Sequence, residues 1–152
     1  MRSNLRELPV DSAQDQARYF PAMPKESTAL RVLVVEDEPL IRWSVAETLA
    51  QAGHTVLEAG DGASALRAVR EASGSIDVVL LDLRLPDSYD LTLLSDIRRL
   101  MPLSTVILVT AFATPDVVAD ALARGADRVA NKPLDIHDLV PLVLHTHSRR
   151  SH

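Results

Sequence analysis

Asp82 stands at the end of a short apolar segment, a position where a carboxylate is unusual. Residues 76–86 read Ile-Asp-Val-Val-Leu-Leu-Asp-Leu-Arg-Leu-Pro. The aliphatic run between Gly74 and Pro86 predicts a strand that is buried on both faces. A carboxylate there is costly to bury unless it is paired with a cation, binds a metal or takes part in a reaction. Because Asp82 alone could equally cap the following loop, the other strand ends must decide its role.

Polar side chains also follow three further apolar segments: Glu36 and Asp37 after Leu30–Val35, Thr110 after Thr105–Val109, and Lys132 after Arg128–Ala130. If these segment ends meet, the carboxylates of Glu36, Asp37 and Asp82 repel one another and need protons or a cation. An all-oxygen group without Cys or His suits a hard ion, Mg²⁺ or Mn²⁺. With a hydroxyl and a lysine beside it, the group could hold a phosphoryl group while Asp82 attacks it as the nucleophile.

Strand-like and helix-like segments alternate from Leu30 onward, which predicts an α/β fold with a parallel sheet covered by helices on both faces. The predicted strands are Leu30–Val35, His54–Ala59, Ile76–Leu81, Thr105–Val109 and Arg128–Ala130. The predicted helices are 39–52, 61–73, 89–101, 114–125 and a last one after Asp135, which either kinks at Pro141 or starts only near Asp138. With strand order 2-1-3-4-5, the polar strand ends would meet in one cleft where the strand order reverses.

Composition restricts the class of protein. The 152 residues carry a formal net charge of −5 and contain no cysteine, which excludes disulfides and thiolate metal sites. The basic residues are scattered, so we expect no direct nucleic-acid binding, and no segment is long and apolar enough for a membrane span. We expect a cytoplasmic protein with a flexible leader over residues 1–29, one folded domain over 30–148 and a tail over 149–152.

Several short motifs together resemble one family. They are Val34-Val35-Glu36-Asp37-Glu38-Pro39, Leu80-Leu81-Asp82-Leu83-Arg84-Leu85-Pro86, Val109-Thr110-Ala111, Gly125-Ala126 and Lys132-Pro133. Residues 30–148 resemble the receiver domain of two-component response regulators, which has a flavodoxin-like fold with five parallel strands and five helices. The stretches 40–43 and 110–113 are similar to receivers of nitrogen-regulation-type transcription activators.

The resemblance implies a signalling protein rather than an enzyme. Asp82 would accept a phosphoryl group from a histidine kinase or a histidine phosphotransfer protein. Mg²⁺ (or Mn²⁺) would be held by Glu36, Asp37, Asp82 and the backbone carbonyl of Arg84. The side chains of Thr110 and Lys132 would contact the phosphoryl oxygens, and the Lys132-Pro133 bond would be cis. Phosphorylation would change contacts with a downstream protein target or with a second copy of the chain.

The sequence departs from the family pattern at three positions. Val129 replaces the usual aromatic switch residue, Asp90 replaces a glycine near the third helix, and Pro141 interrupts the last helix. These departures concern the switch and its readout, and none of them touches the residues of the phosphorylation chemistry. Because only residues 149–152 follow the domain, we expect either a stand-alone receiver or a piece of a longer regulator.

Three alternatives remain at this stage. A haloacid-dehalogenase-type phosphatase normally has a second aspartate two positions after the nucleophile, where this chain has Arg84. An FMN-binding protein would need a phosphate loop and aromatic rings, whereas aromatic residues make up 3% of the chain. The third alternative is a receiver-like module that binds partners without being phosphorylated, which Val129 slightly favours and the complete acidic site opposes.

Overall fold

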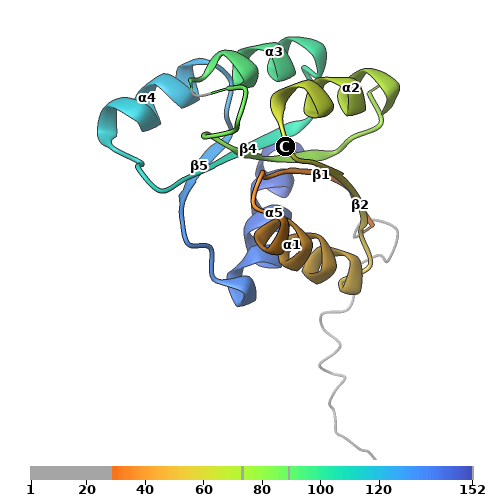
Figure 1. Ribbon diagram of the computed structural model, residues 1–152. Helices are drawn as coiled ribbons and strands as arrows, with labels where there is room; N and C mark the ends of the chain where they lie inside the picture. Colours follow the sequence, from red (N-terminus) through yellow and green to blue (C-terminus); the bar gives the residue numbers. More distant parts are fainter. Residues whose placement is uncertain (1–28, 73, 89, 152) are drawn as a thin grey trace, which may run out of the picture.

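The computed structural model describes residues 29–72, 74–88 and 90–151 (Figure 1). The predicted leader, apart from Ala29, lies outside the described residues. No helix in the described part of the chain is both long and apolar enough to cross a membrane.

A five-stranded parallel sheet forms the centre of the molecule. The strands are β1 (Arg31–Val35), β2 (Thr55–Ala59), β3 (Val78–Asp82), β4 (Thr105–Thr110) and β5 (Arg128–Asn131). Their order is β2-β1-β3-β4-β5, and every neighbouring pair is parallel. The predicted strand order and fold class are therefore confirmed, with strand boundaries shifted by one or two residues.

Five helices cover the two faces of the sheet. They are α1 (Pro39–Gln51), α2 (Gly62–Ala72), α3 (Thr92–Leu100), α4 (Pro115–Ala123) and α5 (Ile136–Ser151). Figure 1 shows α2, α3 and α4 on one face, and α1 and α5 on the other. Because successive side chains of a strand point to opposite faces, Val32 and Leu33 belong to two different apolar clusters.

The third and last helices add to what the sequence predicts about helix boundaries. We expected the third helix to begin near Tyr89, but α3 begins at Thr92, whose backbone N–H donates to the Asp90 carboxylate at 3.0 Å. The last helix begins at Ile136 and contains Pro141, so the alternative of a later start near Asp138 is wrong. This helix also extends to Ser151, past residue 148 where the sequence predicts that the domain ends.

Helix α4 is held by its ends more than by its face. Thr114 accepts a hydrogen bond from the Val117 N–H at 3.3 Å, and Pro115 supplies the first turn, as the sequence predicts. In α4, where every residue is described, only Ala121 is buried, and Leu122 is 48% exposed. Gly125, with φ +112°, follows the helix, and a Cβ at this position would lie 2.6 Å from the Arg98 side chain.

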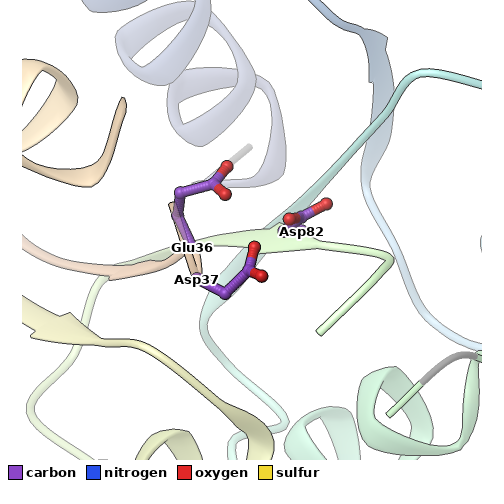
Figure 2. A group of neighbouring side chains, drawn as sticks. All are labelled: Glu36, Asp37 and Asp82. Carbon is purple, nitrogen blue, oxygen red and sulfur yellow. The ribbon is translucent and has the colours of Figure 1, made fainter. Parts of the chain in front are cut away.

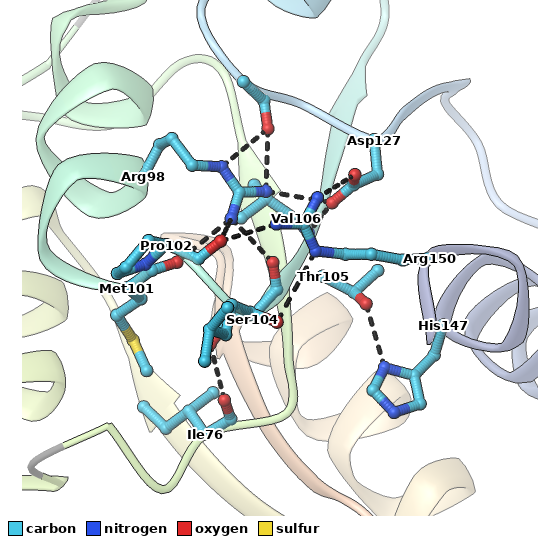
Figure 3. A network of polar contacts seen from close by, with 12 residues as sticks. Ile76, Arg98, Met101, Pro102, Ser104, Thr105, Val106, Asp127, His147 and Arg150 are labelled. Atoms are coloured by element: carbon cyan, nitrogen blue, oxygen red, sulfur yellow. Dashed lines mark hydrogen bonds and ion pairs between the residues drawn. The ribbon is translucent and has the colours of Figure 1, made fainter. Parts of the chain in front are cut away.

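The Arg98 guanidinium connects the segments that meet at the amino-terminal end of β4 (Figure 3). It donates to the carbonyl oxygens of Gly125 and Ser104 at 2.8 and 2.7 Å, and to the Asp127 carboxylate at 2.9 Å. The same carboxylate accepts the Val106 N–H and the Arg150 guanidinium. One arginine therefore joins the end of α3, the start of β4, the end of α4 and, through Asp127, α5.

We predict that Arg98→Ala lowers the free energy of unfolding by roughly 2–4 kcal/mol, because several carbonyl groups and a half-buried carboxylate lose a charged donor. Urea denaturation followed by circular dichroism measures this change. Arg99→Ala is the matched control: its side chain is 67% exposed, and its removal should change stability by less than about 0.5 kcal/mol. Equal effects of the two substitutions would contradict the role given to Arg98.

His54 fixes the entry into β1. It is 5% exposed, and its Nδ1 accepts a hydrogen bond from the Leu30 N–H at 3.1 Å, which requires an unprotonated Nδ1. Desolvation by burial lowers the pKa of His54 below its usual value. In the interval between the two pKa values the unfolded chain binds more protons, so stability rises with pH there.

We predict that the free energy of unfolding falls as the pH is lowered from about 7 through the histidine range. His54→Asn removes the titrating group but keeps an acceptor for Leu30, and it should flatten this dependence. His137→Asn, at an exposed position, should leave the dependence as in the wild type. Unfolding at a series of pH values without divalent cations is the measurement, and an unchanged slope in His54→Asn would contradict the prediction.

Candidate functional site

The polar residues picked out by the sequence lie along one edge of the sheet. In the register of the strands, Val35 pairs with Leu81, Asp82 with Val109, and Thr110 with Asn131. The carboxyl ends of β1, β3, β4 and β5 are therefore level, and the residues that end or follow these strands are brought together. This edge is also where the strand order reverses between β1 and β3.

Three carboxylates meet at this edge (Figure 2). Glu36, Asp37 and Asp82 each offer an oxygen, and these oxygens lie within 4.8 Å of one another. Glu36 and Asp82 are buried, with 6% and 7% exposure, whereas Asp37 is exposed to solvent. The predicted acidic cluster is therefore present, with one side open.

Lys132 offsets the charge of the two buried carboxylates. Its Nζ lies 2.8 Å from Glu36 Oε1 and 3.1 Å from Asp82 Oδ2. Burial lowers the pKa of Lys132, but the hydrogen bond to Glu36 and the charges of Asp82 and Glu36 outweigh burial, so the pKa lies above its usual value. The ammonium group is thus held charged next to Asp82, and the following Lys132-Pro133 bond is cis, as the resemblance implied.

Backbone and side-chain donors fix the acidic groups. The Glu38 N–H donates to Glu36 Oε2 at 3.1 Å, and the Arg84 N–H donates to Asp82 Oδ1 at 3.3 Å. The Arg42 guanidinium donates to the Glu36 carbonyl at 2.8 Å and also contacts Glu58. Our reading of the sequence missed Arg42; the available signal was its position on the first helical turns after the acidic motif.

Thr110 ends β4 and is 1% exposed. Its hydroxyl accepts a hydrogen bond from the Phe112 N–H at 3.1 Å, and its carbonyl accepts the Lys132 N–H at 2.9 Å. Within the described residues, no hydrogen bond joins this hydroxyl to Asp82 or Lys132. The structure therefore brings Thr110 to the predicted edge, while contact with a phosphoryl group stays a prediction.

Arg84 and Phe112 lie together in the two loops that leave β3 and β4. The Arg84 guanidinium carbon stands 4.9 Å from the centre of the Phe112 ring, a cation–π contact. The ring is 57% exposed. These side chains therefore join the loop after Asp82 to the loop after Thr110 on the solvent side.

The donor set fits a hard divalent cation. All three side chains offer carboxylate oxygens, and no cysteine or histidine takes part in the cluster. Mg²⁺ prefers such oxygen ligands and usually keeps several waters, which the exposed side of Asp37 allows. The cluster is typical of the magnesium site of receiver domains.

A hollow of about 330 Å³ adjoins the carboxylates on the side of α1. Its walls are mostly aliphatic, and its polar end is formed by Glu36, Asp82 and Lys132. Leu40 of α1, which lines the hollow, is 75% exposed, and Trp43 of the same helix is 62% exposed. An apolar surface therefore borders the charged site.

Comparison with known proteins agrees with the geometry. Residues 32–144 match the family model described as response regulator receiver domain. The DNA-binding transcriptional regulator NtrC of Escherichia coli is 39% identical over 112 residues, which cover 74% of this chain and 24% of that protein. The chain thus spans about a quarter of the length of this relative, and the likeness supports the predicted resemblance to nitrogen-regulation-type receivers.

Two solved structures have the same fold. A CheY-like receiver domain protein from Methanospirillum hungatei has a TM-score of 0.74 and 26% identity, with 81% of this chain and 97% of that chain covered. The BeF3-activated DrrB receiver domain has a TM-score of 0.70 and 28% identity, with 80% of this chain and 99% of that chain covered. Together with the acidic edge of the sheet, these matches show that the chain belongs to the response regulator receiver domains of two-component signalling, which are signalling modules rather than enzymes.

Proposed function

We propose that Asp82 is the phosphoacceptor of this receiver and takes a phosphoryl group from a histidine kinase or a histidine phosphotransfer protein. The observation that carries the proposal is the position of its carboxylate: it is buried, it lies beside two further carboxylates, and one oxygen is 3.1 Å from the Lys132 ammonium. A carboxylate in such surroundings is typical of a reacting group rather than of a loop cap.

In the proposed reaction, an oxygen of Asp82 attacks the phosphorus of a phosphohistidine. The oxygen–phosphorus bond forms as the phosphorus–nitrogen bond breaks, and the imidazole nitrogen leaves with the bonding electrons. Lys132 offsets the negative charge that gathers on the transferred group, and the Thr110 hydroxyl orients one of its oxygens. The Arg84 N–H keeps the carboxylate oriented for attack.

We further propose that Glu36, Asp37, Asp82 and the Arg84 carbonyl hold Mg²⁺, with Mn²⁺ as a substitute. When bound, the ion neutralises charge on the carboxylates and on the phosphoryl oxygens. Glu36 and Asp82 already share the Lys132 ammonium group, so these two carboxylates are held in place before the ion binds.

The apolar hollow beside the site suits the donor protein. We place the histidine of the donor on a surface laid against α1 and the start of α5, where the exposed Leu40 and the hollow offer apolar contact. Phosphorylated Asp82 would draw in Thr110 and change the face made by α4, β5 and α5, which then contacts a downstream protein or a second copy. Val129, partly buried on β5, replaces the aromatic residue in this readout. We place this reaction in the cytoplasm.

We predict that acetyl phosphate with Mg²⁺ adds the mass of one phosphoryl group to the wild type and none to Asp82→Asn. Removal of Mg²⁺ with a chelator should abolish the reaction as well. Asp120→Asn, at an exposed position of α4, is the matched control and should react like the wild type. Intact-protein mass spectrometry gives the readout, and Trp43 fluorescence on adding beryllofluoride gives a second one.

If the wild type responds in neither measurement, the phosphoacceptor proposal is wrong. The receiver-like module that binds partners without phosphorylation would then be the better description.

We also predict that Arg84→Ala combined with Phe112→Ala shortens the lifetime of phosphorylated Asp82. In this proposal water must part the stacked side chains to reach the phosphoryl group. Loss of such an exposed pair then lowers the barrier to hydrolysis by about 0.5–1 kcal/mol, a two- to fivefold increase in rate. Loss of phosphate after removal of the donor is followed by mass spectrometry. Leu103→Ala, which is 89% exposed, should leave the lifetime unchanged, and an unchanged lifetime in the double variant would contradict the proposal.

A further inference from the structure

The loop between β3 and α3 carries the Arg84 carbonyl, and it is tied down on both sides of that residue. On one side, the Leu83 N–H donates to the Val109 carbonyl of β4 at 3.2 Å. On the other side, Leu85 is 2% exposed and exchanges two backbone hydrogen bonds with Ser88, at 2.9 and 3.2 Å. Arg84 therefore lies between an attachment to the sheet and a small closed turn.

Asp87 attaches this turn to α2. Its Oδ1 accepts the Gly62 N–H at 2.6 Å, and its Oδ2 accepts the Ala63 N–H at 3.0 Å. Both oxygens thus bind the first N–H groups of a helix that lies 24 to 25 residues earlier in the chain. A carboxylate is favourable at a helix amino terminus, and α2 has no acidic residue in its own first turn.

Gly62 allows this contact. A Cβ at this position would stand 3.1 Å from Asp87 Oδ1, closer than side-chain atoms normally approach. The next N–H group along the helix, that of Ser64, donates to Oδ1 of Asp61 at 2.7 Å. Asp61 directly precedes the helix and caps it locally. The same helix end therefore has two caps, one from its own segment and one from the loop that follows Asp82.

We propose that Asp87 is a positioning residue for the metal site: by clamping the turn 85–88 to α2, it fixes the direction of the Arg84 carbonyl. The inference rests on the proposed function, because the carbonyl matters only if it ligates the cation. Residues that orient ligands without touching the ion typically change metal affinity by about 10-fold or more when removed. Asp61 caps the same helix, but the hydrogen bonds of its side chain go to Ser64 and not to the loop, which makes it the matched control.

The test measures Mn²⁺ binding by electron paramagnetic resonance of the free ion, and the Mg²⁺ concentration that half-saturates phosphorylation by acetyl phosphate. Asp87→Ala should weaken Mn²⁺ binding by about 10-fold and raise the half-saturating Mg²⁺ concentration by about the same factor. The maximal rate at saturating Mg²⁺ should change much less. Asp61→Ala should lower the thermal midpoint to a similar extent but leave both metal readouts unchanged.

Asp87→Asn separates geometry from charge. It removes the same charge as Asp87→Ala but keeps an oxygen for the Gly62 N–H, so it should lose less Mn²⁺ affinity. Equal losses in the two Asp87 variants, or equal metal affinities in Asp87→Ala and Asp61→Ala, would overturn the positioning role. A wild type that binds no Mn²⁺ and accepts no phosphoryl group would overturn the proposed function itself, and the inference with it.

Discussion

The site depends on one electrostatic constraint: carboxylates gathered at the edge of an apolar sheet must share a cation. Lys132 supplies it, with its Nζ within 3.1 Å of both buried carboxylates. This lysine lies 96 residues after Glu36 in the chain. The ion pairs of Lys132 form only when β5 is in place next to β4. The repulsion between the buried carboxylates is therefore offset by this lysine only in the completed domain. The contribution of Lys132 to the site is therefore made only as the domain completes its fold.

Much of the site was readable from the sequence because strand ends are local signals. An aliphatic run followed by Glu36, Asp82 or Lys132 marks both the strand and the polar residue after it, and parallel pairing places those ends at one edge. Thr110 was placed correctly for the same reason. Its present partner, the Phe112 N–H, was not predicted, because it depends on the conformation of the loop after β4.

Contacts between segments distant in the sequence were not readable. Arg98 reads as one of two adjacent surface arginines, yet it connects to Gly125 and Asp127 across 27 and 29 residues. Asp87 reads as an ordinary loop residue, and only the fold places it at the start of α2. Helix spacing places Ile41, Val45 and Leu49 on one face of α1, yet only Val45 and Leu49 are buried and Ile41 is 46% exposed, because a buried face is decided by what packs on it.

The weak attachment of α4 has a consequence for how the domain can change. This helix buries only Ala121, whereas α3 buries Leu93, Leu94 and Ile97. Moving α3 would expose several leucine-sized side chains, each contributing about 1.5–3 kcal/mol. Moving α4 would expose one buried alanine and the covered parts of Val117 and Val118, which are only partly buried. The molecule thus has a gradient of rigidity across one face of its sheet. Substitutions and bound proteins can therefore move α4 at a small cost in stability, while the residues at the strand ends keep their positions.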